Sequence, residues 1–231
     1  DTSGAAAYRA LAEAIRLAYN AAFFHPDRDT YGNGSQTEDI LPLALHIAPP
    51  DRREKIADHL ARTIVVDNDG HLDTGITGTE IIGDVLCDHG YGDLALRVFT
   101  NDTYPGFGHQ VRLGATTTWE QWDPVGGMNS HNHAMFSGAS ATLYSRFGGI
   151  QPVGAGYRRF MVKPTVTDPL SWVRVGIETV RGRIRSAWQR QGTDFTLEVE
   201  VPVGAEAEVH VPVDASATVL ESGVQAAMAP G

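Results

Sequence analysis

The stretch Gly148-Gly-Ile-Gln-Pro-Val-Gly-Ala-Gly156 separates two parts of the sequence that have different hydrophobic periods. Before it, apolar residues recur at the spacing of an amphipathic helix; after it, they alternate with polar residues as in a half-buried strand. Glycine and proline at this density interrupt both kinds of element. The sequence therefore predicts a multidomain chain, α then β, with a helical domain over residues 1–150 and a β domain over residues 157–224.

Six helical segments are expected in the first domain, because apolar residues recur there at i, i+3, i+4 and i+7. The expected helices run from about Tyr8 to Phe23, Ser35 to Ala48, Asp51 to Ile64, Ile81 to His89, Leu94 to Phe99 and Asn132 to Phe147. The third is predicted to open with a capping box from Asp51 to Glu54 and to bury Ile56, Leu60 and Ile64. The fourth is predicted to end at Gly90 in the left-handed conformation.

The second domain has the pattern of strands joined by glycine-containing turns. Alternating residues mark about five strands, which are Phe160 to Val166, Trp172 to Val180, Arg183 to Arg190, Phe195 to Val201 and Ala207 to Val213. Gly182, Gly192 and Gly204 lie in or between them as turn residues. Several short strands at this spacing are typical of an antiparallel β-sandwich.

Composition and charge exclude several classes of partner. The 231 residues carry 28 acidic and 18 basic side chains, a formal net charge of −10, which argues against a nucleic acid or an anionic membrane as partner. No apolar run reaches the roughly 18 residues that span a bilayer. The single cysteine, Cys87, excludes an internal disulfide and a cysteine-based zinc site, and is interpreted as a small buried hydrophobic residue. It leaves the compartment, cytoplasmic or exported, undecided.

The segment Gly114-Ala-Thr-Thr-Thr-Trp-Glu-Gln-Trp-Asp123 is the richest in reactive and aromatic side chains. Aromatic rings stack on the apolar faces of sugars while carboxylates handle hydroxyls and glycosidic oxygens, so the segment has the composition of a sugar site. The same pattern also fits a capping box from Thr117 to Glu120, with Trp119 and Trp122 as core residues three positions apart. From the pattern alone, the cap is the favoured interpretation.

No metal or other cofactor is expected. His131 and His133 are two positions apart at an expected helix start, so their side chains diverge around the helix axis, and no further ligands follow at a convincing spacing. Asp67, Asp69 and Asp73 lack the spacing and closing glutamate of a calcium loop and are interpreted as turn formers.

The segment 114–123 closely resembles the G-A-T-T-[IT]-W-E-x-W-D signature of the bacterial α-L-rhamnosidases of glycoside hydrolase family 78. Further segments resemble the family in the same order, namely Tyr31 to Thr37, His71 to Thr79, Thr103 to Gly108 and Ser130 to Phe136. In the second domain, Phe160, Pro164, Gly182-Arg183-Ile184 and Trp188 resemble the β domain that follows in that family. The resemblance thus covers nearly the whole chain.

The resemblance implies an (α/α)6 barrel of six helical hairpins followed by an antiparallel β-sandwich, and hydrolysis of terminal α-L-rhamnosyl groups with inversion. The substrate would be a rhamnosylated small molecule or polysaccharide. Glu120 matches the family's general base, and His133 matches a histidine that hydrogen-bonds the sugar. Trp119 and Trp122 would shape the base and its pocket. With the resemblance included, Glu120 as the base becomes the favoured interpretation over Glu120 as a cap.

The resemblance also indicates what this chain lacks. The family's general acid lies upstream of the part that resembles Asp1, and six helices are half of the twelve that an (α/α)6 barrel requires. The chain is therefore expected to be a partial (α/α)6 barrel with its β domain, inactive or very weak alone. We expect its exposed helix faces to pair with the N-terminal part of the same enzyme or to self-associate.

Three alternatives remain open at this point. A half-barrel with a sandwich could bind carbohydrate through Trp119 and Trp122 without turnover, or the chain could be a purely structural remnant. Another glycosidase with a related helical barrel is the third, since a fold alone does not fix the substrate.

Overall fold

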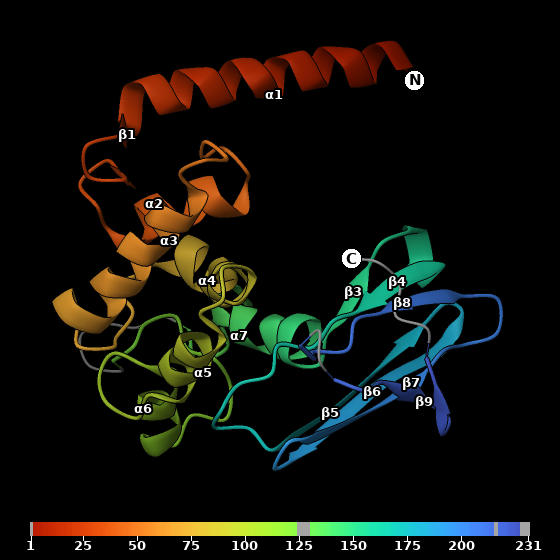
Figure 1. Ribbon diagram of the computed structural model, residues 1–231. Helices are drawn as coiled ribbons and strands as arrows, with labels where there is room; N and C mark the ends of the chain where they lie inside the picture. Colours follow the sequence, from red (N-terminus) through yellow and green to blue (C-terminus); the bar gives the residue numbers. More distant parts are fainter. Residues whose placement is uncertain (1, 124–129, 215–216, 227–231) are drawn as a thin grey trace. The chain divides into compact units, whose positions relative to one another are not determined.

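The computed structural model describes residues 2–123, 130–214 and 217–226 of the chain (Figure 1). The chain divides into two compact units. The first comprises Asp1–Phe147 with Thr167–Leu170, and the second Gly148–Val166 with Ser171–Gly231. Each unit is described by itself below.

The first unit is helical, with one short antiparallel pair of strands near its start. Its elements are α1 (Thr2–Phe23), β1 (Phe24–His25), β2 (Thr30–Tyr31), α2 (Gln36–Ala44), α3 (Arg53–Arg62), the π-helical turn η1 (Thr63–Asp67), α4 (Ile76–Asp88), α5 (Gly92–Thr100), α6 (Phe107–Arg112), the 3-10 turn η2 (Ala134–Phe136), α7 (Gly138–Thr142) and the π-helical turn η3 (Leu143–Phe147). Strand β1 pairs with β2.

The central helices bury the residues that their spacing predicts. Ile56, Leu60 and Ile64 of α3 and η1 are fully buried, as are Ile82 and Leu86 of α4. Helix α4 ends before Gly90, whose φ of 83° is the left-handed conformation expected there. Cys87 of α4 is partly exposed, so its interpretation as a buried residue is wrong.

Helix α1 forms as predicted, but most of its apolar face is exposed. The side chains of Tyr8, Leu11 and Ile15 are 76%, 54% and 52% exposed. The C-terminal end is held by contacts with the rest of the unit: the ring of Tyr19 lies 5.7 Å from that of Tyr31, centre to centre, and the Asn20 amide donates to the Ile47 carbonyl at 2.9 Å. The amphipathic spacing thus predicts the helix correctly, although these apolar side chains remain exposed in the part of the chain that the structure describes.

The capping box lies at α2 and not at α3. The Glu38 carboxylate accepts hydrogen bonds from the backbone N–H and the hydroxyl of Ser35 at 3.0 and 2.9 Å. Helix α3 instead follows Arg52, which has helical φ and ψ angles and makes no side-chain cap, so the predicted box from Asp51 to Glu54 is wrong. The backbone is already turning there, because the N–H of Arg52 bonds to the carbonyl of Pro49.

The single helix predicted from Asn132 to Phe147 is three short pieces, η2, α7 and η3. The break coincides with a close approach of two backbones at Gly138. A Cβ atom there would lie 2.0 Å from the carbonyl oxygen of Glu80 in α4, so only glycine fits. Helix α6, in a segment that the pattern presents as a loop, was not predicted.

The second unit contains two three-stranded sheets that share one core, and a small separate hairpin. Its elements are β3 (Ile150–Pro152), the 3-10 turn η4 (Ala155–Tyr157), β4 (Arg159–Val162), β5 (Trp172–Thr179), β6 (Gly182–Gln191), β7 (Asp194–Glu200), β8 (Glu206–Val209), β9 (Leu220–Glu221) and β10 (Val224–Gln225). The orders are β3-β4-β8 and β5-β6-β7, and β9 pairs with β10.

The core of the second unit is built by strands of both larger sheets. Ile150, Phe160 and Val162 of β3 and β4 pack with Ile184 of β6, and apolar residues of β5 and β7 pack against this cluster. This is the sandwich that the alternating pattern predicts. One pairing differs from the prediction, because β4 and β8 run parallel, with Phe160 opposite Ala207. The other described strand pairs of this unit are antiparallel, as predicted.

Across the ranges that the structure describes, we find no helix with the length and hydropathy needed to cross a membrane.

Candidate functional site

Glu120 lies in a bend that follows α6, not at the start of a helix. Its N–H donates to the carbonyl of Ser130 at 3.0 Å, and the N–H of His133 donates to the carbonyl of Thr118 at 2.8 Å. Segments 117–120 and 130–133 therefore run side by side, joined by main-chain hydrogen bonds. The interpretation of Thr117 to Glu120 as a capping box is wrong, because the backbone here pairs with another segment and opens no helix.

Side chains strengthen this pairing. The Thr118 hydroxyl donates to the carbonyl of His133 at 3.0 Å and lies 3.0 Å from the hydroxyl oxygen of Ser137. Trp119 is 8% exposed, with its ring centre 5.1 Å from that of His131. The structure thus brings three of the predicted site residues, Trp119, Glu120 and His133, onto two adjacent segments.

Trp122 occupies a different environment from Trp119. Its ring makes edge contacts with Phe107 at 5.0 Å and Phe136 at 5.4 Å between centres. The buried amide of Gln110 in α6 donates to the carbonyl of Gln121 at 2.8 Å, which fixes the backbone just before it. Trp122 remains partly exposed, so its ring presents an apolar surface to solvent.

That surface forms one wall of a cavity of about 510 Å³. The cavity is lined by Asn68, residues 71–75, Tyr104, Pro105 and Trp122. These residues come from three loops, between η1 and α4, between α5 and α6, and after α6. The volume is within the roughly 300–1,000 Å³ typical of ligand pockets. Of the four predicted site residues, all of them in the described part of the chain, only Trp122 lines it.

Sequence reasoning missed five polar or aromatic residues of this cavity, which are Asn68, His71, Asp73, Thr74 and Tyr104. All of these except Asn68 belong to the segments that carry the family resemblance, which was the available signal. Asp73 was interpreted as a turn former because the spacing of neighbouring aspartates excluded a calcium loop. The spacing could not show that this loop faces the one that carries Tyr104.

The loop over residues 68–75 is held from several sides. The side chain of Gln36, fully buried, donates from Nε2 to the carbonyl of His71 at 2.9 Å and accepts the N–H of Asp73 at Oε1 at 3.2 Å. The imidazole of His71 is hydrogen-bonded to the Asn68 carbonyl at 3.0 Å and to the Thr103 hydroxyl at 2.8 Å. These bonds fix the cavity wall before any ligand arrives.

The carboxyl group of Asp73 is at the surface of the cavity and is exposed overall. Partial burial by the cavity wall raises its pKa above the ordinary value, and the negative charge of Glu38 acts in the same direction. Backbone hydrogen bonding lowers the pKa and offsets part of this effect. Asp73 is thus a hydrogen-bond acceptor in a partly desolvated position.

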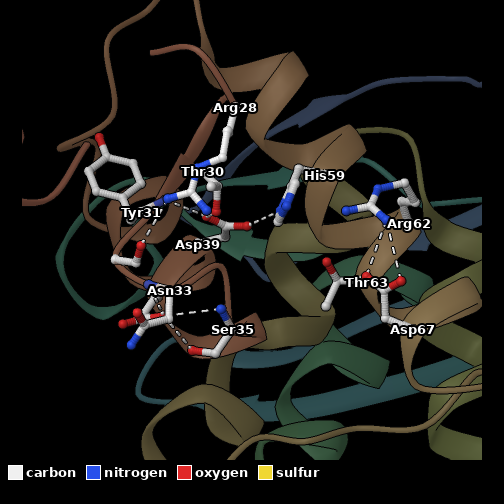
Figure 2. A network of polar contacts seen from close by, with 12 residues as sticks. Arg28, Thr30, Tyr31, Asn33, Ser35, Asp39, His59, Arg62, Thr63 and Asp67 are labelled. Carbon is white, nitrogen blue, oxygen red and sulfur yellow. Dashed lines mark hydrogen bonds and ion pairs between the residues drawn. The ribbon is translucent and has the colours of Figure 1, made fainter. Parts of the chain in front are cut away.

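A second polar cluster supports helix α2, which begins at Gln36 (Figure 2). Asp39, fully buried in α2, accepts hydrogen bonds from the Thr30 hydroxyl at 2.7 Å and the Tyr31 N–H at 3.0 Å, and lies 2.7 Å from Nδ1 of His59 in α3. Burial raises the pKa of Asp39, and these hydrogen bonds offset part of the rise. In a nucleophilic triad the histidine lies between acid and hydroxyl. Here the carboxylate is central, so the cluster joins β2, α2 and α3 structurally.

The described residues contain no group of three or more histidine, cysteine, aspartate or glutamate side chains arranged to hold a metal ion.

Comparison with known proteins accounts for both units. Residues 1–146 match the family model of the bacterial alpha-L-rhamnosidase 6 hairpin glycosidase domain, and residues 149–226 match that of the bacterial alpha-L-rhamnosidase C-terminal domain.

Named relatives and similar solved structures are alpha-L-rhamnosidases as well. The chain is 33% identical to an alpha-L-rhamnosidase of Streptomyces avermitilis over 218 residues, 91% of this chain and 21% of the relative. An alpha-L-rhamnosidase of Formosa agariphila is 32% identical over 219 residues, 91% of this chain and 24% of the relative.

The structure of alpha-L-rhamnosidase from Dictyoglumus thermophilum is similar with a TM-score of 0.88 and 34% identity over 94% of this chain and 25% of that one. The Streptomyces avermitilis enzyme complexed with L-rhamnose gives a TM-score of 0.83 at 31% identity, over 91% of this chain and 21% of that one. The chain thus spans between a fifth and a quarter of these relatives. It belongs to the bacterial α-L-rhamnosidase family of six-hairpin glycosidases.

Proposed function

We propose that the chain supplies the general-base side of the active site of an inverting α-L-rhamnosidase, acting on a rhamnosylated small molecule or polysaccharide. Glu120 is the base, His133 hydrogen-bonds the rhamnosyl group, and Trp119 and Trp122 shape the pocket. The observation that carries the proposal is the main-chain pairing of segments 117–120 and 130–133, which sets Glu120 and His133 on adjacent segments next to Trp122 and its cavity.

To act as a general base, Glu120 needs chiefly the right position relative to the attacking water. In an inverting hydrolysis one carboxylate removes a proton from water as that water attacks the anomeric carbon, and a second carboxylic acid protonates the departing oxygen from the opposite face. Glu120 is partly exposed and can therefore reach a water molecule. The buried indole of Trp119 and the bond from Glu120 N–H to Ser130 fix the backbone on which the carboxylate is mounted.

The acid is proposed to come from outside these 231 residues. The relatives are four to five times longer than the part that matches, which leaves room in them for the other hairpins of the barrel. In this proposal residues 1–150 are the later hairpins and residues 157–224 the β domain. The partner is the N-terminal part of the same enzyme, or a second copy, and it covers the exposed face of α1 at Tyr8, Leu11 and Ile15.

A chimera tests the role of Glu120. The matching fifth of the Streptomyces avermitilis enzyme is replaced by this chain, and hydrolysis of p-nitrophenyl α-L-rhamnoside is measured. Glu120→Gln should lower kcat about 10²- to 10⁴-fold, the usual contribution of a general base. Azide, which needs no deprotonation, should restore turnover in Glu120→Ala. Glu178→Gln, an exposed residue of β5, is the matched control and should leave kcat unchanged.

Two outcomes would contradict the proposal. If the 231-residue chain alone hydrolyses the substrate at a rate that Glu120→Gln abolishes, the acid is not outside it. If the 231-residue chain binds L-rhamnose in calorimetry but the folded wild-type chimera does not turn over, the chain is a carbohydrate-binding module and not half of an active site.

A further inference from the structure

The cavity beside Trp122 does not include the proposed base. Its walls are the loop from Asn68 to Gly75, the Tyr104-Pro105 pair and Trp122, and Glu120 is not among the described residues that line it. A rhamnosyl group under attack must present its anomeric carbon to a water held by the base. A pocket that held this reacting ring would therefore include the carboxylate of Glu120. The cavity adjoins the reaction site, since Trp122 is two residues from Glu120, but it accommodates a different part of the substrate.

The lining of the cavity indicates what that part is. The rings of Tyr104 and Trp122 offer flat apolar surfaces with polar edges, suited to the C–H face of a pyranose. Asp73 offers a carboxylate acceptor in a partly desolvated position. Small-ligand sites usually combine aromatic or apolar walls with a small number of polar groups that point to the same place.

The walls are also rigid where a ligand would need them. Gln36 fixes the backbone on both sides of Leu72 by its two hydrogen bonds, and His71 joins the loop to Thr103, the neighbour of Tyr104. A site fixed in advance loses less entropy when it binds.

We propose that this cavity is the subsite for the sugar to which the rhamnosyl group is attached, with Asp73 accepting its hydroxyls and Tyr104 and Trp122 packing on its ring. The inference rests on the proposed function and deepens it: Glu120 acts on the rhamnosyl linkage, and Asp73 selects a pyranose on the leaving-group side over an aglycone without hydroxyls.

Binding to the 231-residue chain tests the assignment, by calorimetry and by quenching of tryptophan fluorescence. The probes are the disaccharide α-L-rhamnosyl-(1→6)-D-glucose and L-rhamnose alone. The wild-type chain should bind the disaccharide about ten-fold more tightly than L-rhamnose. Asp73→Asn should remove that advantage, because the loss of one charge-assisted hydrogen bond corresponds to roughly a ten-fold change in Kd. Tyr104→Ala should reduce it as well.

The matched control is Asp69→Asn in the same loop. Asp69 is exposed, lies outside the cavity lining and has a φ of 51°, which asparagine also tolerates, so disaccharide binding should be unchanged. If Asp73→Asn weakened the binding of L-rhamnose and of the disaccharide equally, the assignment would be overturned, because the cavity would then hold the rhamnosyl ring. The absence of any preference for the disaccharide in the wild-type chain would overturn it as well.

Failure of this inference and failure of the proposed function give different results. The preference for the disaccharide and its loss in Asp73→Asn are measured with Glu120 unchanged, whereas the role of Glu120 is measured by the turnover of the chimera. A preference for the disaccharide that depends on Asp73 therefore supports the subsite even if the role of Glu120 is wrong.

Discussion

Gln36 fixes the backbone of Asp73. Its side-chain oxygen accepts the Asp73 N–H at 3.2 Å while its nitrogen donates to the carbonyl of His71 at 2.9 Å, so one buried amide satisfies a donor and an acceptor two residues apart. The segment that follows Tyr31 and the segment that begins at His71 both carry the family resemblance, and this amide is a physical link between them. Each is needed to hold the other in place.

Replacing Gln36 should therefore weaken the fold and loosen the cavity wall. Gln36→Glu keeps the acceptor for the Asp73 N–H but sets a carboxylate oxygen against the His71 carbonyl, and it should lower the free energy of unfolding by about 1–3 kcal/mol. Urea unfolding measures the loss. Gln189→Glu, at an exposed position of β6, should change stability by less than about 0.5 kcal/mol. Equal effects of the two substitutions would show that the amide has no structural role.

The two aspartates of Figure 2 should differ sharply in their contribution to stability. Asp39→Ala leaves the buried Thr30 hydroxyl and Tyr31 N–H without their acceptor, and should cost on the order of 3 kcal/mol. Asp67→Ala breaks an ion pair with Arg62 in which both side chains are about half exposed, and should cost less than about 1 kcal/mol. Thermal and urea unfolding of both variants test this, and a loss for Asp67→Ala that matched that for Asp39→Ala would contradict it.

Stability should fall at alkaline pH through Tyr31. Burial raises the pKa of its phenol to about 12, from an ordinary value of 10. Below about pH 10 the phenol is neutral in both states. As the pH rises from there toward 12, only the unfolded chain releases the proton, so the free energy of unfolding decreases, by on the order of 2 kcal/mol.

Urea unfolding at several pH values between about 10 and 12 measures this effect. Tyr31→Phe should flatten the decrease, although it also removes the hydrogen bond from the phenol to Asn20 and lowers stability at every pH. Tyr91, whose pKa is also raised to about 12, chiefly by its hydrogen bond to Asp58, contributes its own smaller decrease and is removed by Tyr91→Phe. An identical slope in the wild-type and Tyr31→Phe chains would rule out the assignment.

The exposed face of α1 should make the isolated chain self-associate. Leu11→Glu with Ile15→Glu places charges on that face and should shift the chain toward a monomer at micromolar concentration in light scattering. Val203→Glu is the matched control, since Val203 is fully exposed in the turn before β8 and belongs to no such face. A wild-type chain that is already a clean monomer would contradict the expectation.

Local pattern predicted the elements well where one face is buried and less well where the backbone makes special contacts. The spacing of Ile56, Leu60 and Ile64 predicted their burial because a helix with one apolar stripe packs only one way. The break before Gly138 could not be predicted, since it coincides with a contact to the backbone of Glu80, which lies in another helix. The capping box was predicted at Asp51 and is found at Ser35. Both residues are hydrogen-bond acceptors followed three positions later by a glutamate, so the local pattern does not distinguish them.

The candidate site, too, has features that the local sequence predicts and features that depend on tertiary contacts. Residues adjacent in sequence, such as Trp119, Glu120 and Trp122, could be named from their composition and the family resemblance. The pairing of Glu120 with Ser130, and the cavity that brings Asp73 near Tyr104, depend on tertiary contacts between segments that no local pattern connects. The roles of Glu120, His133, Trp119 and Trp122 in catalysis and sugar binding stay predictions.

The parallel pairing of β4 with β8 affects the order in which the strands of the second unit can pair during synthesis. The whole β5-β6-β7 sheet lies in the sequence between these two neighbouring strands. The hairpins of that sheet have local contacts and can form early, whereas β4 finds its edge partner only after the chain beyond Glu206 exists. During synthesis, an incomplete chain would therefore present the edge of β4 unpaired. An unpaired strand edge of this kind is a site at which nascent chains can associate prematurely.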